Sequence, residues 1–279
     1  MSPAKIARFA QSDQYFRCPN CHEPLMLDGQ SLRCVNRHCF DLARQGYVNL
    51  DPSAKQSDFY NSDLFADRGR ILAAGYYDHI RDAVLETVTS ANPRTILDVG
   101  CGEGFYSRAI AQSDSSAQIF AFDIAKSSIQ IGAREDMTSN IAWFVGNLMD
   151  IPLQSHTIDC IIDIFSPANY AEFDRLLTEH GTIVKVVPGA AHVQELREAA
   201  ANQLSNGAHY SNDKVVTMFR EHVPNMRQFT VSQTMQMPAE DVLAFAHMTP
   251  LFFNVDLDRV DLRSVDRITV QAEILVGSK

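Results

Sequence analysis

The sequence lacks several features that mark membrane and secreted proteins. It contains no run of 18 or more apolar residues, and its N-terminus has no apolar signal region. Repeats and low-complexity tracts are also absent. Basic residues are few, with 24 lysines and arginines against 34 acidic residues, and the net charge of −10 argues against indiscriminate nucleic-acid binding. We therefore expect a soluble, cytoplasmic protein that makes no membrane contact.

The chain of 279 residues, of which 46% are hydrophobic, can form one large domain and a small module. An amphipathic helical pattern begins at residue 64 and is interrupted by Gly75. Strands are expected at 95–100, 118–123, 141–147, 158–165 and 181–188, with helices from 105, from 127 and over 169–180 between them. A helix over 192–204, a polar excursion at 202–225, a strand at 227–236, a helix at 240–248 and a strand at 267–277 follow. This alternation predicts an α/β fold with a doubly wound parallel sheet, which the last two strands complete as a hairpin.

Most of the cysteines gather near the N-terminus, and in a cytosolic chain such clustering indicates a metal site. Cys18 and Cys21 form a C-x2-C pair, and after twelve residues Cys34 and His38 form a second pair. Two short apolar runs around Asp28 and Gly29 predict a hairpin between the pairs. Such a ribbon is too small to fold on apolar burial alone, so the metal must stabilise it. A short helix and an extended stretch are expected to follow over 40–51.

Two adjacent residues compete to be the fourth metal ligand of this site. We take Zn²⁺ to be held by Cys18, Cys21, Cys34 and His38. Cys39 competes with His38, because a C-x4-C pair is also feasible, whereas His22 lies outside the spacing. Four protein ligands leave no open position for water, so the zinc is expected to be structural.

The stretch LDVGCGEGFYSR, residues 97–108, carries the strongest functional signal. Gly100, Gly102 and Gly104 remove Cβ atoms where a buried strand turns into a helix, so a ligand can lie against bare backbone. A dinucleotide site has the spacing G-x-G-x-x-G, but here it is G-x-G-x-G with Asp98 before it. A carboxylate beside the turn suits a cationic, amine-bearing ligand better than a phosphate.

This turn resembles the first motif of the class I S-adenosylmethionine (SAM)-dependent methyltransferases. In that family the next strand ends in an acidic residue for the ribose hydroxyls, which Asp123 matches. The third strand ends in Gly146 and Asn147, where the family holds the adenine. The resemblance implies a Rossmann-like SAM-dependent methyltransferase domain with an N-terminal zinc ribbon.

Longer phrases resemble a narrower family. The CPxC ribbon, HCFDLARQGYVNL and DVGCGEGFY together are similar to the bacterial 23S ribosomal RNA guanine methyltransferases of the RlmA family, and DIFSPANY, HMTPL and AEILVG resemble its Gram-positive, tylosin-resistance branch. The resemblance implies methylation of N1 of one guanine in a domain II hairpin of 23S rRNA, macrolide resistance, and a homodimer with an RNA cleft between subunits. It also implies cofactor contacts by Tyr77, Gly102, Glu103 and His192. The predicted organisation is a zinc-ribbon RNA-recognition module at 1–50, a linker at 51–63 and the methyltransferase domain at 64–279.

The chemistry requires that guanine N1 lose its proton during or after methyl transfer, and a nearby base would help. Asp163 and the loop 165–170 follow the fourth strand, where related base-modifying methyltransferases hold their target. Phe165 and Tyr170 are candidates to stack on a flipped guanine. The ribbon's basic side chains are candidates to hold the RNA backbone: Arg17, Arg33, Arg37 and Arg44.

Two other functions compete with this interpretation. The first is a small-molecule or protein methyltransferase in which the ribbon serves only for structure or dimerisation. The second is a SAM-binding regulator without activity, against which the intact Asp98, glycine turn and Asp123 argue.

Overall fold

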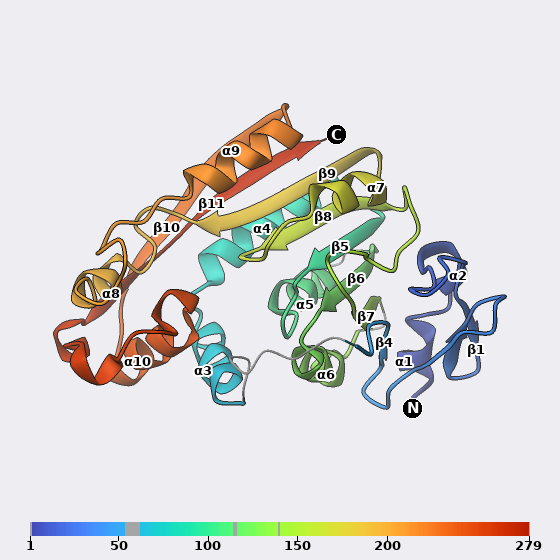
Figure 1. Ribbon diagram of the computed structural model, residues 1–279, viewed down its shortest axis with the longest axis horizontal. Coiled ribbons are helices and arrows are strands. Elements are labelled where there is room, and N and C mark those ends of the chain that lie inside the picture. The colour runs from blue at the N-terminus through green and yellow to red at the C-terminus, as the bar shows by residue number, and fades with distance from the viewer. Residues whose placement is uncertain (1, 54–61, 114–115, 139, 279) are drawn as a thin grey trace.

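The computed structural model describes residues 2–53, 62–113, 116–138 and 140–278, and its centre is an eight-stranded sheet in the order β10-β11-β9-β8-β5-β6-β7-β4 (Figure 1). Strands β4 to β9 are parallel, and β11 runs antiparallel to β9 and to β10. The strands are β4 (Tyr47–Asn49), β5 (Thr95–Val99), β6 (Gln118–Asp123), β7 (Ile141–Val145), β8 (Ile158–Ile164), β9 (Leu177–Pro188), β10 (Met226–Gln236) and β11 (Arg267–Ser278). The predicted doubly wound sheet with a closing hairpin is confirmed. The order reverses between β5 and its neighbours β6 and β8, which is where open α/β sheets bind ligands.

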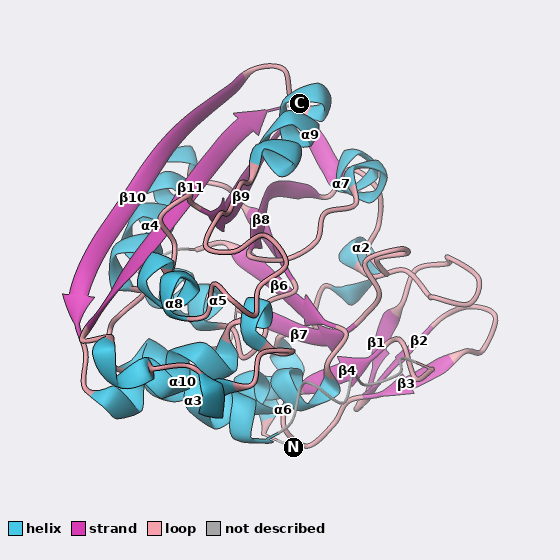
Figure 2. Cartoon of the chain, turned by 60° about the vertical axis from the view of Figure 1, so that its left-hand side comes forward, coloured by secondary structure: helices cyan, strands magenta, loops and turns pink. Residues whose placement is uncertain are grey.

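Helices and the ribbon cover both faces of the sheet, which explains why β5 and β7 are buried at every position. The helices are α1 (Pro3–Ala7), α2 (Ser12–Tyr15), α3 (Ser62–Ala73), α4 (Asp78–Ala91), α5 (Phe105–Gln112), α6 (Lys126–Glu135), α7 (Tyr170–Leu176), α8 (Gln194–Ala199), α9 (Asp213–His222) and α10 (Ala239–Met248). One core contains side chains of α4, α5, α6, α8 and α10, and the other contains those of the ribbon, α7 and α9. Helix α3 packs against α10, as Figures 1 and 2 show.

Several predicted elements need correction. The expected helix after Phe40 is a turn between β3 (Cys39–Asp41) and β4. The helix predicted over 169–180 ends at Leu176, because residue 177 already pairs with β8. The helix expected over 192–204 is confined to α8, and the polar excursion at 202–225 contains the unpredicted helix α9. The predicted break at Gly75 is confirmed, since α3 ends before it and α4 begins after it, and its φ is +82°.

The N-terminal ribbon is a second, three-stranded antiparallel sheet of β1 (Met26–Asp28), β2 (Ser31–Arg33) and β3 (Figure 2). Asp28 pairs with Ser31, and Gly29 makes the turn at φ +62°, so the predicted hairpin is confirmed. The chain then enters the main sheet as β4, which pairs with β7. The predicted linker at 51–63 lies largely outside the described residues.

The ribbon and the main domain share one core. The ring of Phe16 meets Phe120 on β6 edge-on at 5.6 Å and Phe144 on β7 at 5.4 Å, measured between ring centroids. A buried ion pair joins Arg8 to Asp136 at 2.8 Å. The ribbon is therefore packed against the eight-stranded sheet. No helix in the described ranges is long and apolar enough to cross a membrane.

Candidate functional site

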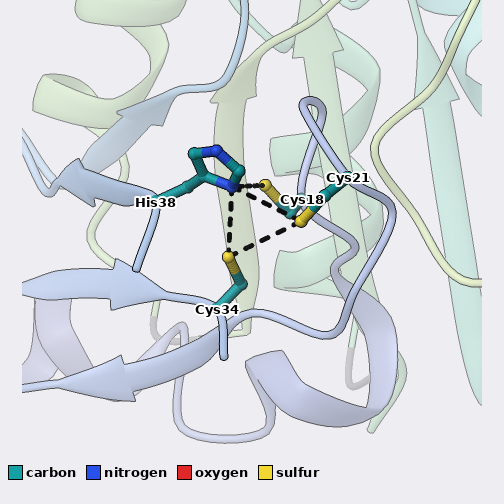
Figure 3. A group of neighbouring side chains, drawn as sticks. All are labelled: Cys18, Cys21, Cys34 and His38. Atoms are coloured by element: carbon teal, nitrogen blue, oxygen red, sulfur yellow. Dashed lines mark hydrogen bonds between the residues drawn. The ribbon is translucent and has the colours of Figure 1, made fainter. Parts of the chain in front are cut away.

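The four predicted zinc ligands meet in one cluster in the ribbon (Figure 3). The Nδ1 atom of His38 lies 3.5 Å from the Sγ of Cys18 and 3.4 Å from those of Cys21 and Cys34. The Cys21 and Cys34 sulfurs are 3.7 Å apart. Ligands about 2.0–2.3 Å from a tetrahedral Zn²⁺ are about 3.5–3.8 Å from one another, so this donor set fits zinc.

The structure decides the fourth zinc ligand in favour of His38. Cys39 is exposed on β3, and its thiol faces Asp41 at 3.8 Å. The imidazole of His22 lies instead beside the carboxylate of Asp150, at 3.3 Å. The site is therefore a closed Cys3His site of structural type.

The three glycines of the turn all have left-handed backbone conformations, with φ of +65° at Gly100, +57° at Gly102 and +72° at Gly104. A Cβ at Gly104 would overlap the buried Trp143 ring, and one at Gly100 would overlap Ser166. At Gly102 a Cβ would come within 3.1 Å of the Arg68 guanidinium. The turn thus needs glycine both for its backbone angles and for close packing against β7 and the loop after β8.

Two carboxylates flank this turn, one buried (Asp98) and one partly buried (Asp123). The Asp98 carboxylate accepts a hydrogen bond from Ser107 Oγ at 2.5 Å, and burial raises its pKa to about 7. The Asp123 carboxylate accepts hydrogen bonds from the backbone N–H groups of Gly102 (2.9 Å) and Ala125 (2.8 Å). Burial also raises the pKa of Asp123, although these backbone donors lower it. Both side chains are held by local donors and oriented for a ligand at the strand ends.

A cavity of about 870 Å³ opens at the carboxyl ends of β5, β6, β8 and β9. Most residues predicted to bind the cofactor line it: Tyr77, Asp98, Gly100, Gly102, Asp123, Asn147 and His192. Glu103 and Gly104 do not belong to the described lining, since Glu103 is directed to Arg68 at 3.4 Å and Gly104 packs on Trp143. The predicted contacts of these residues with a cofactor remain predictions.

Aromatic rings form one wall of the cavity. Tyr77 stacks on Phe245 at 5.8 Å between centroids and meets Phe165 edge-on at 6.0 Å. His192 stacks on Phe165 at 6.0 Å. Burial, and then the nearby Arg197, lower the pKa of His192 to about 4. Its Nδ1 accepts the Gln271 N–H at 3.3 Å, so the neutral ring carries its proton on Nε2 and offers a donor.

The end of the cavity beside the loop after β8, called the acceptor end below, contains one of the three predicted catalytic residues among its described lining. Phe165 lines it, is 39% exposed and has a φ of +54°. Asp163 is fully buried behind Lys185, which lines the cavity. Tyr170 is not among the described lining residues, and its ring stacks on His222 at 4.3 Å. Its predicted contact with guanine receives no support from this position.

Other lining residues were not predicted. Arg68 on α3 lies over Gly102, and Lys185 on β9 forms an ion pair with Asp163. Tyr210 follows α8, and the Arg197 guanidinium lies 5.7 Å from the centre of its ring. A lone lysine inside the apolar run GTIVKVVP was a usable signal for Lys185. Nothing comparable marks Arg68 or Tyr210.

Comparison with known proteins identifies the family. A model of the N-terminal part of RlmA matches residues 16–57, and a methyltransferase-domain model matches residues 96–186. A Bacillus subtilis protein named "Putative 23S rRNA (guanine-N(1)-)-methyltransferase" is 34% identical, over 95% of this chain and 97% of its own. The chain belongs to the RlmA family.

One further relative and one solved structure resemble this RlmA-family protein. The 23S rRNA (guanine(748)-N(1))-methyltransferase of Streptomyces fradiae is 27% identical over 90% of each chain. The solved structure of the Bacillus subtilis YcgJ protein matches with a TM-score of 0.48 and 15% identity, over 72% of this chain and 98% of that one. Family membership confirms the predicted family and fold class, and with them SAM and zinc as cofactors.

Proposed function

We propose that this protein transfers a methyl group from SAM to N1 of one guanine in 23S rRNA. The observation that carries the proposal is a single cavity that runs from the Asp98 and Asp123 carboxylates to Phe165 and Lys185. Its volume accommodates a cofactor and a purine base side by side. The full-length match to a relative with a 23S rRNA (guanine-N1) methyltransferase name supports the choice of substrate.

The chain's own residues suit the cofactor in distinct ways. We assign Asp98 to the cationic amino-acid end, Asp123 to the ribose hydroxyls and Asn147 to the adenine, with the bare backbone of Gly100 and Gly102 between them. Tyr77, Glu103 and His192 are further cofactor contacts that the family resemblance implies. When bound, SAM supplies a methyl group already activated by its sulfonium, so the protein mainly contributes proximity and alignment.

The target guanine is proposed to enter beside Phe165. A paired base must leave its helix to reach this depth, and the half-exposed Phe165 ring offers a stacking surface at the cavity mouth. Tyr210, held by Arg197, offers a second ring. Because His192 is neutral and protonated on Nε2, it can donate to a base or carboxylate but is not suited to take the N1 proton.

We propose that the ribbon holds the RNA backbone through its exposed arginines, Arg33, Arg37 and Arg44. Arg17 has a different role, since its ion pairs with Asp150 and Glu172 connect the zinc knuckle to the loop after β7 and to α7. Phosphate contacts of this kind position an RNA without reading its sequence. They also supply local positive charge to a chain that is acidic overall.

Finer assignments follow the family resemblance. We propose a guanine in a domain II hairpin as the target, membership of the tylosin-resistance branch with macrolide resistance as the consequence, and a homodimer with the RNA between its subunits. The Streptomyces fradiae relative, named for guanine 748, supports such a target. A ribosomal substrate would place the enzyme in the cytoplasm.

The proposed role of the ribbon is tested by charge removal rather than by truncation, because deleting residues 1–50 would also remove β4 and the Phe16 core contacts. The variant replaces Arg33, Arg37 and Arg44 with alanine, and a control replaces three exposed arginines far from the ribbon: Arg220, Arg263 and Arg267. Transfer of labelled methyl groups to unmodified 23S rRNA should fall in the first variant, mainly through a higher KM. Equal KM values for both variants would show that the ribbon is not the RNA contact.

The competing functions predict different results in the same assay. A small-molecule or protein methyltransferase would bind SAM but transfer nothing to 23S rRNA, and the arginine variant would match its control. A regulator without activity would bind SAM and methylate no acceptor at all.

A further inference from the structure

A buried ion pair lies at the acceptor end of the cavity. Asp163 on β8 and Lys185 on β9 are register partners in adjacent parallel strands, so both side chains leave the sheet on the same face. Lys185 Nζ donates to Asp163 Oδ2 at 2.7 Å and to the Ser166 carbonyl at 2.9 Å. The Lys185 and Asp163 side chains are only 3% and 0% exposed.

A contribution to the stability of the fold does not explain why this ion pair is buried here. Removing two charges from water costs several kcal/mol per ion, and apolar residues of similar volume stabilise a core at least as well. The pair is also incompletely satisfied, since Asp163 Oδ1 has no hydrogen-bond partner in the described part of the chain. Lys185 uses two of its three N–H donors on protein acceptors there and lines the cavity next to Phe165.

We propose that Lys185 donates its third N–H to O6 of the target guanine and stabilises the negative charge that O6 acquires when N1 loses its proton. This inference rests on the proposed function and deepens it by naming a catalytic residue. Asp163 is then a positioning residue: it holds the ammonium group of Lys185 at the cavity wall and does not touch the base.

The step balances without any further reactant. The N1 proton passes to solvent water, and its electron pair is shared over N1, C6 and O6 of the base, where the ammonium group faces it. N1 then forms a bond to the methyl carbon as the bond from that carbon to sulfur breaks, and the sulfur keeps the electron pair. A preorganised cation at the cavity wall favours this charge more than freely rotating water dipoles would.

The charged and titratable groups around this end are few. Asp163 faces Lys185 from β8, and burial raises its pKa to about 7 although Lys185 lowers it. The charge of Asp98 on β5 also raises the pKa of Asp163, and Asp163 in turn raises the pKa of Tyr170 on α7. Lys185 is therefore the cation that directly faces a base beside Phe165, while Arg68 and Arg197 are engaged with Glu103 and with backbone carbonyls.

The test measures single-turnover methyl transfer to a 23S rRNA fragment against pH, from 6 to 10, for wild type and Lys185→Met. Lys214→Met, an exposed lysine on α9, is the matched control. We expect Lys185→Met to be slower by about 100-fold at neutral pH, as on removal of an oxyanion donor. The deficit should shrink as rising pH ionises guanine N1 without help, while SAM affinity measured by calorimetry stays unchanged.

A deficit of the same size at every pH, or no deficit, would overturn the proposal, because an ammonium group that stabilises the ionised base must matter less once high pH ionises N1 unaided. If Lys185→Met fails to fold with an uncompensated Asp163, the double variant Lys185→Met/Asp163→Asn removes both charges and must show the same profile. Wild-type protein that makes no 1-methylguanosine would refute the proposed function and this inference together. Activity with parallel profiles would refute only the inference.

Discussion

Binding of the cofactor should depend on pH through Asp98. This carboxyl group is buried beside the glycine turn, and its pKa is raised to about 7, so below that pH the folded protein holds it protonated. A protonated carboxyl cannot attract the cationic end of SAM or of S-adenosylhomocysteine. The affinity for either ligand should therefore rise as pH increases towards 7.

The size of the effect follows from the ionised fraction. With a pKa of about 7, roughly 3% of Asp98 is ionised at pH 5.5 and about half at pH 7. If only the ionised form binds, the apparent Kd falls by about 15-fold across this window, which is about 1.6 kcal/mol. The ligand's own α-amino group stays protonated below about pH 7.7, so it contributes little there.

Calorimetric titration with S-adenosylhomocysteine at pH 5.5 and pH 7 measures this directly. His192 does not interfere, because its pKa is lowered to about 4 and it is neutral at both values. In Asp98→Asn the affinity should be lower at pH 7 and should depend less on pH. Asp123 should account for the pH dependence that remains. Equal Kd values for the wild-type protein at the two pH values would refute the assignment of Asp98 to the cationic end.

Two further substitutions probe the packing of the turn and the metal site. Gly104→Ala adds a Cβ against Trp143, so in urea unfolding it should destabilise the protein by about 1–3 kcal/mol more than Gly207→Ala does. Gly207 has a similar left-handed backbone (φ +57°), and a Cβ there would make only an ordinary contact, with the Ala201 carbonyl oxygen at 4.0 Å. Equal losses would contradict the packing argument. Cys34→Ser should abolish zinc binding and melt the ribbon at lower temperature, as seen by metal analysis and calorimetry, whereas Cys39→Ser should retain full zinc content. Zinc loss in the Cys39 variant would contradict the Cys3His assignment.

The elements that sequence predicted well are those with strong local signals. In β5 and β6 an apolar strand ends in residues that packing alone does not explain, the glycine turn and the acidic Asp123. Ligands bind at such strand ends in open α/β sheets, so these two signals were specific. The metal site was predictable because ligand spacing is nearly independent of the rest of the fold. Even there, adjacent His38 and Cys39 could be distinguished only by the direction of β3.

The errors occurred where tertiary contacts override local preference. Residues 177–180 have a helical composition but are drawn into β9 by pairing with β8. Helix α9 buries only Val216 and Phe219, so its polar sequence concealed it. The position of Arg68 over the glycine turn depends on a partner far along the chain, Glu103, and its local sequence gives no sign of it. Lys185 differs, because a lysine inside an apolar run does indicate a buried charge, although its partner Asp163 is set only by the pairing of β8 with β9.

Methylation of guanine N1 in 23S rRNA can be measured directly. The protein is incubated with labelled SAM and unmodified 23S rRNA, and the modified nucleoside is identified by mass spectrometry after digestion. We expect a single 1-methylguanosine, located in a domain II hairpin. A different methylated nucleoside, or cofactor binding with no methylation of the RNA, would contradict it.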